Sequence, residues 1–269
     1  LAAIAEPTLG YITNYGKAHL EGFGGFEGII KGKSELYDYL ASSKSGVALV
    51  NADDTLQMDK SAACKRITFG NASAQFAYQS DSHNEFAGIT FSNTSGSFAV
   101  QSNLSGSFNC TNLGAATTIG LYFDVPATAI AEALSNYVPA MNRVEWRVTA
   151  RNKVLLDAYN ANPTSMSLSI ENFAKWHPHG WLILGDMFEL GAESAAEHQA
   201  MIELIRGTGM EERCILVGKH FDATNWQKLK FASTSDLETY WKENGAPKDA
   251  ALLLKGSRGI ALEQLLPLL

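Results

Sequence analysis

The sequence predicts an α/β protein of two domains. A parallel sheet with a small antiparallel hairpin layer is followed by a Rossmann-like doubly wound domain. Two observations predict this class. Short apolar runs alternate with stretches of helical periodicity along most of the chain, which is typical of parallel strands covered on both faces. The region from Phe86 to Phe108 is instead rich in Ser, Asn, Thr and Gly and alternates polar with apolar residues, which favours antiparallel strands.

The composition limits the possible functions. A length of 269 residues suffices for one large or two medium domains, and a net charge of -7 argues against general binding of nucleic acid or anionic membranes. Cys64, Cys110 and Cys214 show no metal-ligand spacing, so we expect reduced core residues of a cytoplasmic protein. We expect no membrane span and no signal peptide. Because residues 1–5 lack an initiator Met and read like the middle of a helix, we expect a fragment of a longer protein.

The first domain is predicted to span residues 1–139 and to begin with a β-α-β unit. Strands at residues 11–12 and 47–50 flank a helix at residues 26–40, which favours a parallel pair with a right-handed crossover. The other expected elements are a strand at 67–70, a hairpin turn at 93–96, and helices at 112–121 and 127–138. Pro126 suits the first turn of the last helix.

The second domain, residues 140–269, follows a linker at residues 139–143 and alternates strictly between strand and helix. Strands are expected at 154–156, 181–184, 215–217 and 251–254, and helices at 164–173, 195–205, 236–241 and 260–265. The domain lacks a Gly-x-Gly-x-x-Gly turn, so no motif supports a dinucleotide site.

The first candidate site is the polar block Thr13-Asn14-Tyr15-Gly16-Lys17-Ala18-His19-Leu20-Glu21 and the later Lys33. The block follows a predicted strand, and ligands collect at the carboxyl ends of strands in open α/β sheets. The alternative is a structural His19 and a solvated helix lysine at position 33. The stretch around Lys33 is not a phosphate loop, because only three residues separate Gly28 from Gly32 and the pattern there is helical.

Three further candidates carry chemistry typical of nucleotide sites. Asp157 leaves a predicted strand and could accept hydrogen bonds from a sugar diol, although Asn160 and Asn162 make a helix-capping cluster equally plausible. Asn109 and Asn112 would share the first turn of a helix, where their amides could bind an adenine or simply cap the helix.

Arg143 lies in the linker and could hold a phosphate on domain closure, or form a surface ion pair of little value, with Arg147 one turn further on. The segments 184–191, with Asp186, and 255–259, with Lys255, Ser257 and Arg258, follow strands of the second domain. Both segments could bind a ligand that carries a carboxylate. Alternatively, they are ordinary β-α turns without a binding role.

In their order along the chain, these blocks resemble the Mur ligase family. The matching motifs are 12–21, Lys33-Ser34-Glu35, Asn51-Ala52-Asp53-Asp54, Asn109-x-x-Asn112, Asn142-Arg143, Asp157-x-Tyr159-Asn160-Ala161-Asn162-Pro163, Leu184-Gly185-Asp186-Met187 and Lys255-Gly256-Ser257-Arg258. Within the family they are most similar to the members that add D-alanyl-D-alanine to UDP-N-acetylmuramoyl-tripeptide. The Asp-Asn-Pro-Arg motif of the diamino-acid-adding members is absent from the corresponding region.

The resemblance implies the C-terminal part of a central ATP-binding domain at 1–139 and a complete Rossmann-like C-terminal domain at 140–269. It implies an ATP-dependent amide ligase of peptidoglycan precursor synthesis, hence of cell wall biogenesis and cell division. Such an enzyme is a cytoplasmic monomer that forms an acyl phosphate and binds UDP-N-acetylmuramoyl-tripeptide and D-alanyl-D-alanine. Alternatives are a folylpolyglutamate-type or cyanophycin-type ligase, or a non-catalytic nucleotide-binding module.

The resemblance also implies residue roles. His19 and a carbamylated Lys33 would bind Mg²⁺, Asn109 and Asn112 the adenine of ATP, Asp157 the ribose, and Arg143 the phosphates. The residues expected at the dipeptide are Asn160, Asn162, Asp186, Lys255, Ser257 and Arg258. The family often has His where Phe108 stands, and its phosphate loop is expected upstream of Leu1. We therefore expect the chain to be inactive alone and Lys33 to be little carbamylated.

Overall fold

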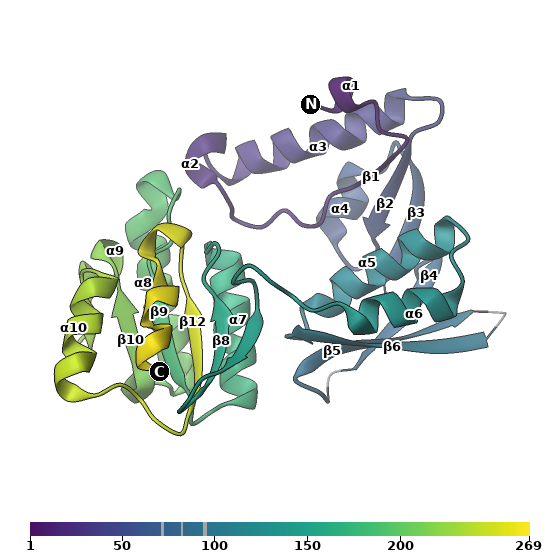
Figure 1. The fold of residues 1–269 in the computed structure, drawn as a ribbon. Coiled ribbons are helices and arrows are strands. Elements are labelled where there is room, and N and C mark those ends of the chain that lie inside the picture. The colour runs from purple at the N-terminus through teal and green to yellow at the C-terminus, as the bar shows by residue number, and fades with distance from the viewer. Residues whose placement is uncertain (71–72, 82, 94–95) are drawn as a thin grey trace. The chain divides into compact units, whose positions relative to one another are not determined.

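A computed structural model describes residues 1–70, 73–81, 83–93 and 96–269. Its contacts divide the chain into two compact units. The first unit consists of Leu1–Gly16 and Phe23–Tyr137, and the second of Lys17–Gly22 and Val138–Leu269. Each unit contains its own sheet and its own core, which follow separately below (Figure 1).

The first unit is built on a mixed sheet whose strand order, β1-β2-β3-β4-β5-β6, follows the chain (Figure 1). Its strands are β1 (Leu9–Tyr11), β2 (Val47–Asn51), β3 (Lys65–Gly70), β4 (Phe76–Asp81), β5 (Phe86–Asn93) and β6 (Gly96–Ser105). Pairing is parallel from β1 to β4 and antiparallel from β4 to β6, which confirms the predicted parallel sheet and hairpin layer. The turn predicted at 93–96 falls partly outside the described residues.

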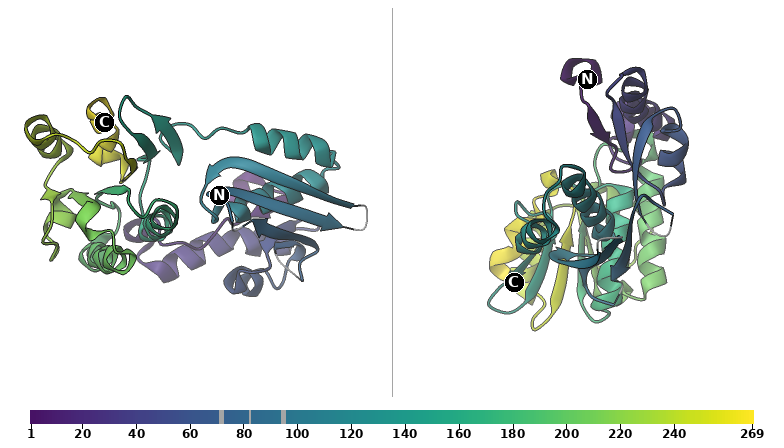
Figure 2. Two further views of the ribbon diagram at one scale, coloured as in Figure 1. Left: turned by 90° about the horizontal axis from the view of Figure 1, so that it is seen from below. Right: turned by 90° about the vertical axis from the view of Figure 1, so that its right-hand side faces the viewer.

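Helices cover both faces of this sheet. They are α3 (Phe26–Ser42), α4 (Thr55–Lys60), α5 (Asn109–Tyr122) and α6 (Ala127–Asn136), and the short helix α1 (Ala2–Ala5) contacts α3. Side chains alternate across a strand, so Leu49 of β2 joins the core cluster that includes α5, whereas Ala48 and Val50 join the cluster that includes α3. Helix α6 lies along β6 (Figure 2). Burial on both faces explains why β2 is apolar along most of its length.

The second unit is built on a sheet of strand order β11-β10-β9-β12-β8-β7. Its strands are β7 (Glu145–Val148), β8 (Lys153–Asp157), β9 (Trp181–Gly185), β10 (Cys214–Val217), β11 (Lys230–Phe231) and β12 (Ala251–Lys255). All pairs are parallel except β7 with β8. The Rossmann-like prediction is confirmed, but Arg147 lies in strand β7 and not one helical turn beyond Arg143.

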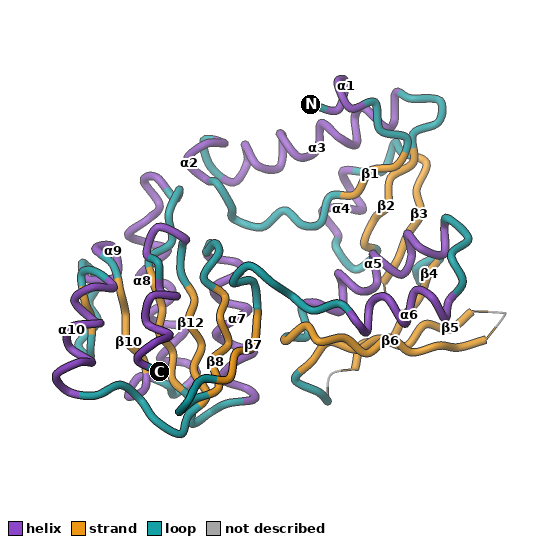
Figure 3. The backbone as a smooth tube through the Cα atoms, viewed as in Figure 1, coloured by secondary structure: helices purple, strands orange, loops and turns teal. Residues whose placement is uncertain are grey.

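Helices flank this second sheet as well. They are α7 (Pro163–Trp176), α8 (Ser194–Thr208), α9 (Lys219–Asp222) and α10 (Thr234–Asn244), with 3₁₀ turns at Gly191–Glu193, Glu211–Arg213, Arg258–Ile260 and Leu262–Leu268. The short helix α2 (Leu20–Phe23) lies where the chain passes from this unit back to the first. Residue Leu20 of α2 belongs to this unit, and Phe23 to the first. Helix α10 and the last 3₁₀ turn pack on one face, and α7 and α8 pack together on the other (Figure 3). The helix predicted at 260–265 is thus a 3₁₀ turn, in which Pro267 can donate no backbone hydrogen bond.

The cysteines and the helix lengths can be compared with what the composition predicts. Cys110 and Cys214 are buried free thiols, and Cys64 is a half-buried one. Burial raises the pKa of the Cys214 thiol, which keeps it protonated and unreactive. Every helix in the described ranges is too short or too polar to span a membrane.

Candidate functional site

Two strands of the second unit end in a buried ion pair. Asp157 is the last residue of β8 and Lys255 the last of β12, and the parallel register sets them directly opposite each other. Their side chains are bonded to each other, and Asp157 also accepts a hydrogen bond from Ser169 Oγ at 3.3 Å. Lys255 is 1% exposed and Asp157 8%. The carboxylate predicted to bind a ribose and the ammonium predicted to bind a dipeptide therefore neutralise each other.

Asp186, which follows β9, fixes the loop that follows β10. Its carboxylate accepts hydrogen bonds from the backbone N–H groups of His220 and Phe221, both at 2.9 Å. The loop requires Gly218, whose φ is 124° and whose hypothetical Cβ would lie 2.2 Å from the Asp186 carboxyl carbon. The structure thus gives Asp186 a clear local role in shaping this edge of the sheet.

Ser257 ties the loop after β12 to the loop after β9. Its backbone N–H donates to the carbonyl of Asp186 at 3.0 Å, and its Oγ accepts the backbone N–H of Phe188 at 2.9 Å. Ser257 is 3% exposed. Asp186 and Ser257 together therefore hold three neighbouring loops in one arrangement.

A buried histidine of α8 supports the same loop. His198 Nε2 accepts the backbone N–H of Met187 at 3.0 Å, and Nδ1 lies 2.7 Å from the carbonyl oxygen of Ser194, to which it can donate. Both bonds together require a neutral ring that is protonated on Nδ1. Burial lowers the pKa of His198, although the Ser194 carbonyl and the Asp186 carboxylate act in the opposite direction.

An aromatic ring brings two of the predicted arginines together. The guanidinium carbon of Arg143 lies 3.7 Å from the ring centroid of Tyr159, and that of Arg258 lies 5.5 Å from it. Arg143 precedes β7, Tyr159 follows β8, and Arg258 follows β12. The three side chains thus converge from separate parts of the sequence.

Asn160 and Asn162 bond to nearby backbone. Asn160 Oδ1 accepts the N–H of Ala161 at 2.9 Å. Asn162 caps α7, where its Oδ1 accepts the N–H of Ser165 at 2.9 Å and its own N–H donates to Ser165 Oγ at 3.2 Å. This capping box corresponds to the alternative considered for Asn162 from the sequence.

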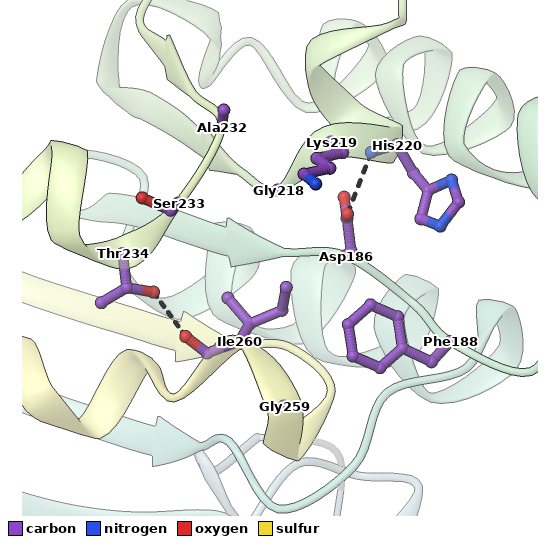
Figure 4. A pocket seen from close by; sticks show the side chains of 10 residues that line it. All are labelled: Asp186, Phe188, Gly218, Lys219, His220, Ala232, Ser233, Thr234, Gly259 and Ile260. Atoms are coloured by element: carbon purple, nitrogen blue, oxygen red, sulfur yellow. Dashed lines mark hydrogen bonds between the residues drawn. The ribbon is translucent and has the colours of Figure 1, made fainter.

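A pocket of about 260 Å³ opens between the loops that follow strands β9, β10, β11 and β12. Figure 4 shows Phe188 and Ile260 on one wall and Lys219 near Asp186 on another. The full lining is Asp186, Phe188, Gly218, Lys219, His220, Ala232, Ser233, Thr234, Gly259 and Ile260. Its volume lies near the lower limit for ligand sites, and one apolar wall with a nearby cation suits a small anionic molecule.

Lys33, in the first unit, lies on α3 beside the end of β1. Its Nζ donates to the carbonyl of Asn14 at 2.8 Å. With Tyr11, Ile12, Thr13, Asn14 and Leu36 it lines a pocket of about 300 Å³. Burial lowers the pKa of Lys33, so this residue is not a fully solvated helix lysine.

The other predicted residues are divided between the units. Asn112 Nδ2 donates to Asn109 Oδ1 at 2.9 Å, and Asn109 Nδ2 donates to the carbonyl of Ser105 at 2.9 Å, within the first unit. His19 belongs to the second unit, adopts a φ of 57°, and its Nδ1 pairs with the carboxylate of Glu189. Lys33 belongs to the first unit, so the predicted joint role of His19 and Lys33 rests on the resemblance.

The described residues do not form a complete magnesium site. Mg²⁺ requires several hard oxygen ligands in near-octahedral geometry. In the described ranges, no group of three or more His, Cys, Asp or Glu side chains is arranged to hold a metal ion. Lys33 as an amine donates a hydrogen bond and cannot act as a ligand.

Sequence reasoning did not select Tyr159, Lys219 or Glu189 as site residues. Tyr159 lies inside a motif that carries the resemblance, so that motif is the signal that could have identified it. Glu189 lies inside the candidate segment 184–191, and Lys219 has only the weaker signal of following a strand. His198 falls in the helix predicted at 195–205, but its contact with Met187 depends on tertiary packing.

Comparison with known proteins is consistent with this architecture. The family model described as Mur ligase middle domain matches residues 1–120, and the model described as Mur ligase, glutamate ligase domain matches residues 142–258. The UDP-N-acetylmuramoyl-tripeptide--D-alanyl-D-alanine ligases of Escherichia coli and Bacillus subtilis are 31% and 29% identical to the chain. These matches cover 97% and 98% of this chain and 60% of each relative, so the chain spans about three fifths of their length.

Solved structures share the fold. The crystal structure of MurF from Acinetobacter baumannii superimposes with a TM-score of 0.82 and 26% identity, over 99% of this chain and 60% of that one. MurF ligase from Thermotoga maritima, in complex with ADP, has a TM-score of 0.81 and 21% identity, over 99% and 62%. Two Mur ligase domain models match successive parts of the sequence, and relatives of one name match nearly all of it. The chain therefore belongs to the Mur ligase family.

Proposed function

We propose that this chain is part of an ATP-dependent amide ligase that adds D-alanyl-D-alanine to UDP-N-acetylmuramoyl-tripeptide in peptidoglycan precursor synthesis. The observation that carries the proposal is the similarity to ligases of this name over 97% of the chain. Because the chain spans 60% of that relative, the proposal concerns the whole protein. Residues 1–139 would be the C-terminal part of the central ATP-binding domain, and residues 140–269 the C-terminal domain.

The proposed reaction has two chemical steps. The terminal carboxylate of the tripeptide attacks the γ-phosphorus of ATP, which gives an acyl phosphate and ADP. The amine of D-alanyl-D-alanine then attacks the acyl carbon, and the tetrahedral intermediate expels phosphate and leaves the amide. Phosphoryl transfer depends mainly on positioning and charge neutralisation. Arg143 is exposed beside the Tyr159 ring, and this accessible cation supports the proposal that Arg143 binds the phosphates.

Nucleotide and metal binding are assigned by the same proposal. Asn109 and Asn112 would bind the adenine and Asp157 the ribose. His19 and a carbamylated Lys33 would contribute to Mg²⁺ binding, and Mg²⁺ would neutralise phosphate charge when bound. The lowered pKa of Lys33 supports this role, since only a neutral amine reacts with carbon dioxide to form a carbamate.

The incoming dipeptide is assigned to the second unit. Asn160, Asn162, Asp186, Lys255, Ser257 and Arg258 are the proposed contributors. The support is their common location at the carboxyl ends of β8, β9 and β12, where ligands of open α/β sheets bind. The pocket beside Asp186 has a size and a cation that suit a short peptide carboxylate.

Phosphate release by the full-length protein, measured with ATP, the UDP-linked tripeptide and D-alanyl-D-alanine, tests the proposal. We expect turnover that requires all three substrates. Lys33→Ala should reduce it about 100-fold or more, because the carbamate proposed to help bind Mg²⁺, and with it the charge neutralisation at the phosphates, is lost. Lys31→Ala, on the exposed face of the same helix, is the matched control and should leave the rate unchanged.

The alternatives predict different results. A folylpolyglutamate-type or cyanophycin-type ligase would release phosphate with other acceptor amino acids and not with D-alanyl-D-alanine. A non-catalytic nucleotide-binding module would show no substrate-dependent release, and Lys33→Ala would then change nothing. Either result would contradict the proposal.

A further inference from the structure

We propose that Tyr159 is a positioning residue that holds Arg143 and Arg258 as a two-arginine clamp for a single phosphoryl group. The inference deepens the proposed function and rests on it for the identity of that group. It moves Arg258 from the dipeptide to the phosphoryl group, and it gives Tyr159 a role.

The side chains of Arg143 and Arg258 both lie over the ring of Tyr159. Both guanidinium carbons lie within about 6 Å of the Tyr159 ring centroid, the range of an effective cation–π contact. At 3.7 Å, Arg143 is in direct contact with the ring. Tyr159 is half-buried, whereas Arg143 and Arg258 are exposed. The ring therefore forms a fixed support, and the charged groups remain accessible to a ligand.

Neither arginine has a carboxylate partner among the described residues. Two cations on one ring repel each other, and an anion bound between them would relieve that repulsion. Two of the other arginines in the unit, Arg147 and Arg206, pair with acids, at Glu145 and Glu203 respectively. Among the described residues, by contrast, neither Arg143 nor Arg258 forms an ion pair.

An aromatic ring suits an anion-binding pair of arginines better than a carboxylate partner does. A carboxylate partner would occupy N–H donors and cancel charge, which would weaken binding of a second anion. An aromatic face holds a guanidinium in place and leaves its five N–H donors available. Arginine donors in such a fork bind phosphate oxygens with high directional specificity. Tyr159 can therefore orient both cations without neutralising them.

The backbone on both sides of Arg143 is strained. Met141, Asn142 and Val144 have φ values of 61°, 60° and 50°. This left-handed region is disfavoured for residues other than glycine, most of all for a β-branched residue such as Val144. A linker held in this conformation on both sides of Arg143 needs compensating contacts. The close contact of Arg143 with Tyr159 is one of them.

Titration of the 269-residue chain with inorganic phosphate tests the clamp directly. Arginine Nε–Hε resonances would be followed by NMR in the unaltered chain and in Arg143→Gln and Arg258→Gln variants, which assign the signals. We expect the signals of both arginines to shift with one common midpoint. Tyr159→Phe should retain that midpoint, and Tyr159→Leu should raise it about tenfold.

Several outcomes would overturn the clamp. These are separate midpoints for the two arginines, a shift of only one of them, or a Tyr159→Leu variant that binds like the unaltered chain. Trp176→Leu is the matched control, because it removes another cation–π contact of the unit, that with Lys175 at 4.7 Å. If Tyr159→Leu does not fold, the common midpoint and the Tyr159→Phe result still decide the matter. Acetate that binds as well as phosphate would overturn the assignment to a phosphoryl group.

Activity of the full-length protein gives the second readout. Tyr159→Leu should lower kcat about tenfold with a smaller change in KM for ATP, and Tyr159→Phe should restore kcat. A merely structural tyrosine would instead lower thermal stability without this kinetic split. The phosphate titration needs no turnover. The experiments therefore distinguish two results. The phosphate titration can fail while the ligase activity is present, or it can succeed while the ligase activity is absent.

Discussion

At the scale of single residues, the pair formed by Asp157 and Lys255 carries the largest expected effect on stability. Two charges removed from water are tolerated only because they compensate each other, so loss of one partner leaves an uncompensated buried charge. The pair also lies between strands that are distant in sequence but adjacent in the sheet.

We expect Lys255→Met to lower the free energy of unfolding of the second unit by about 3–5 kcal/mol. The double variant Lys255→Met, Asp157→Leu should recover much of this loss. Urea unfolding followed by tryptophan fluorescence measures it, because all five tryptophans lie in the second unit. Lys242→Met, which removes an exposed pair with Glu238, is the control and should cost less than 1 kcal/mol. Equal effects of the two lysine substitutions would contradict the prediction.

His198 predicts a pH dependence of stability. Burial lowers its pKa in the folded state, so the unfolded chain binds the proton more readily. The stabilisation is complete above the ordinary histidine pKa of about 6.5 and is lost as the pH falls from there to the folded-state pKa. Asp186 and Glu197 limit the shift, and His220 adds to it. The urea midpoint of the second unit should therefore be lower at pH 5 than at pH 7.5.

Replacement of this histidine should remove part of that dependence. We expect His198→Asn to reduce the difference between the two pH values, with a lower midpoint at pH 7.5 because the bond to Met187 is lost. His179→Asn, at an exposed site, should retain the full difference. If the two variants behave alike, other groups cause the pH dependence.

At the scale of elements, the capping box of α7 separates structural from functional roles at Asn162. We expect Asn162→Ala to destabilise the second unit by about 1 kcal/mol, and Asn162→Asp to retain the cap and the stability. The same variants in the ligase assay test the assignment to the dipeptide. If Asn162 also binds substrate, Asn162→Asp should lose activity while it unfolds normally. Full activity of Asn162→Asp would leave Asn162 as a cap alone.

In the second sheet, strands buried on both faces could be predicted from the sequence, and the two edge strands could not. Strands β8, β9, β10 and β12 are nearly continuous apolar runs, which a parallel sheet requires. Strand β7 contains two charged residues and is partly exposed at the edge of the sheet, and β11 has only two residues. Neither gives an apolar pattern that distinguishes it from a loop.

The candidate site was predictable as a set of motifs but not as a set of contacts. The order of motifs along the chain identified the family. The pairing of Asp157 with Lys255 depends on β12 lying next to β8, and strand order cannot be read from local sequence. The convergence of Arg143 and Arg258 on Tyr159 likewise depends on segments distant in sequence.

At the scale of the whole molecule, the path of the chain between the two units differs from that of two domains joined by one linker. Residues Lys17–Gly22 belong to the second unit although they precede most of the first. Within the second unit, Lys17 donates its backbone N–H to Thr164 Oγ1 at 3.1 Å, and its ammonium pairs with Glu197. The backbone N–H of Glu21 donates to the carbonyl of Glu189 at 3.1 Å.

The chain therefore passes between the units three times. A protease cut at residues 138–142 would break one of these covalent connections and leave the other two intact. A piece excised at Val138 would in turn lack the segment that neutralises Glu197 and bonds to Glu189. The second unit is thus assembled from two separate stretches of sequence, and a single division of the gene cannot reproduce it.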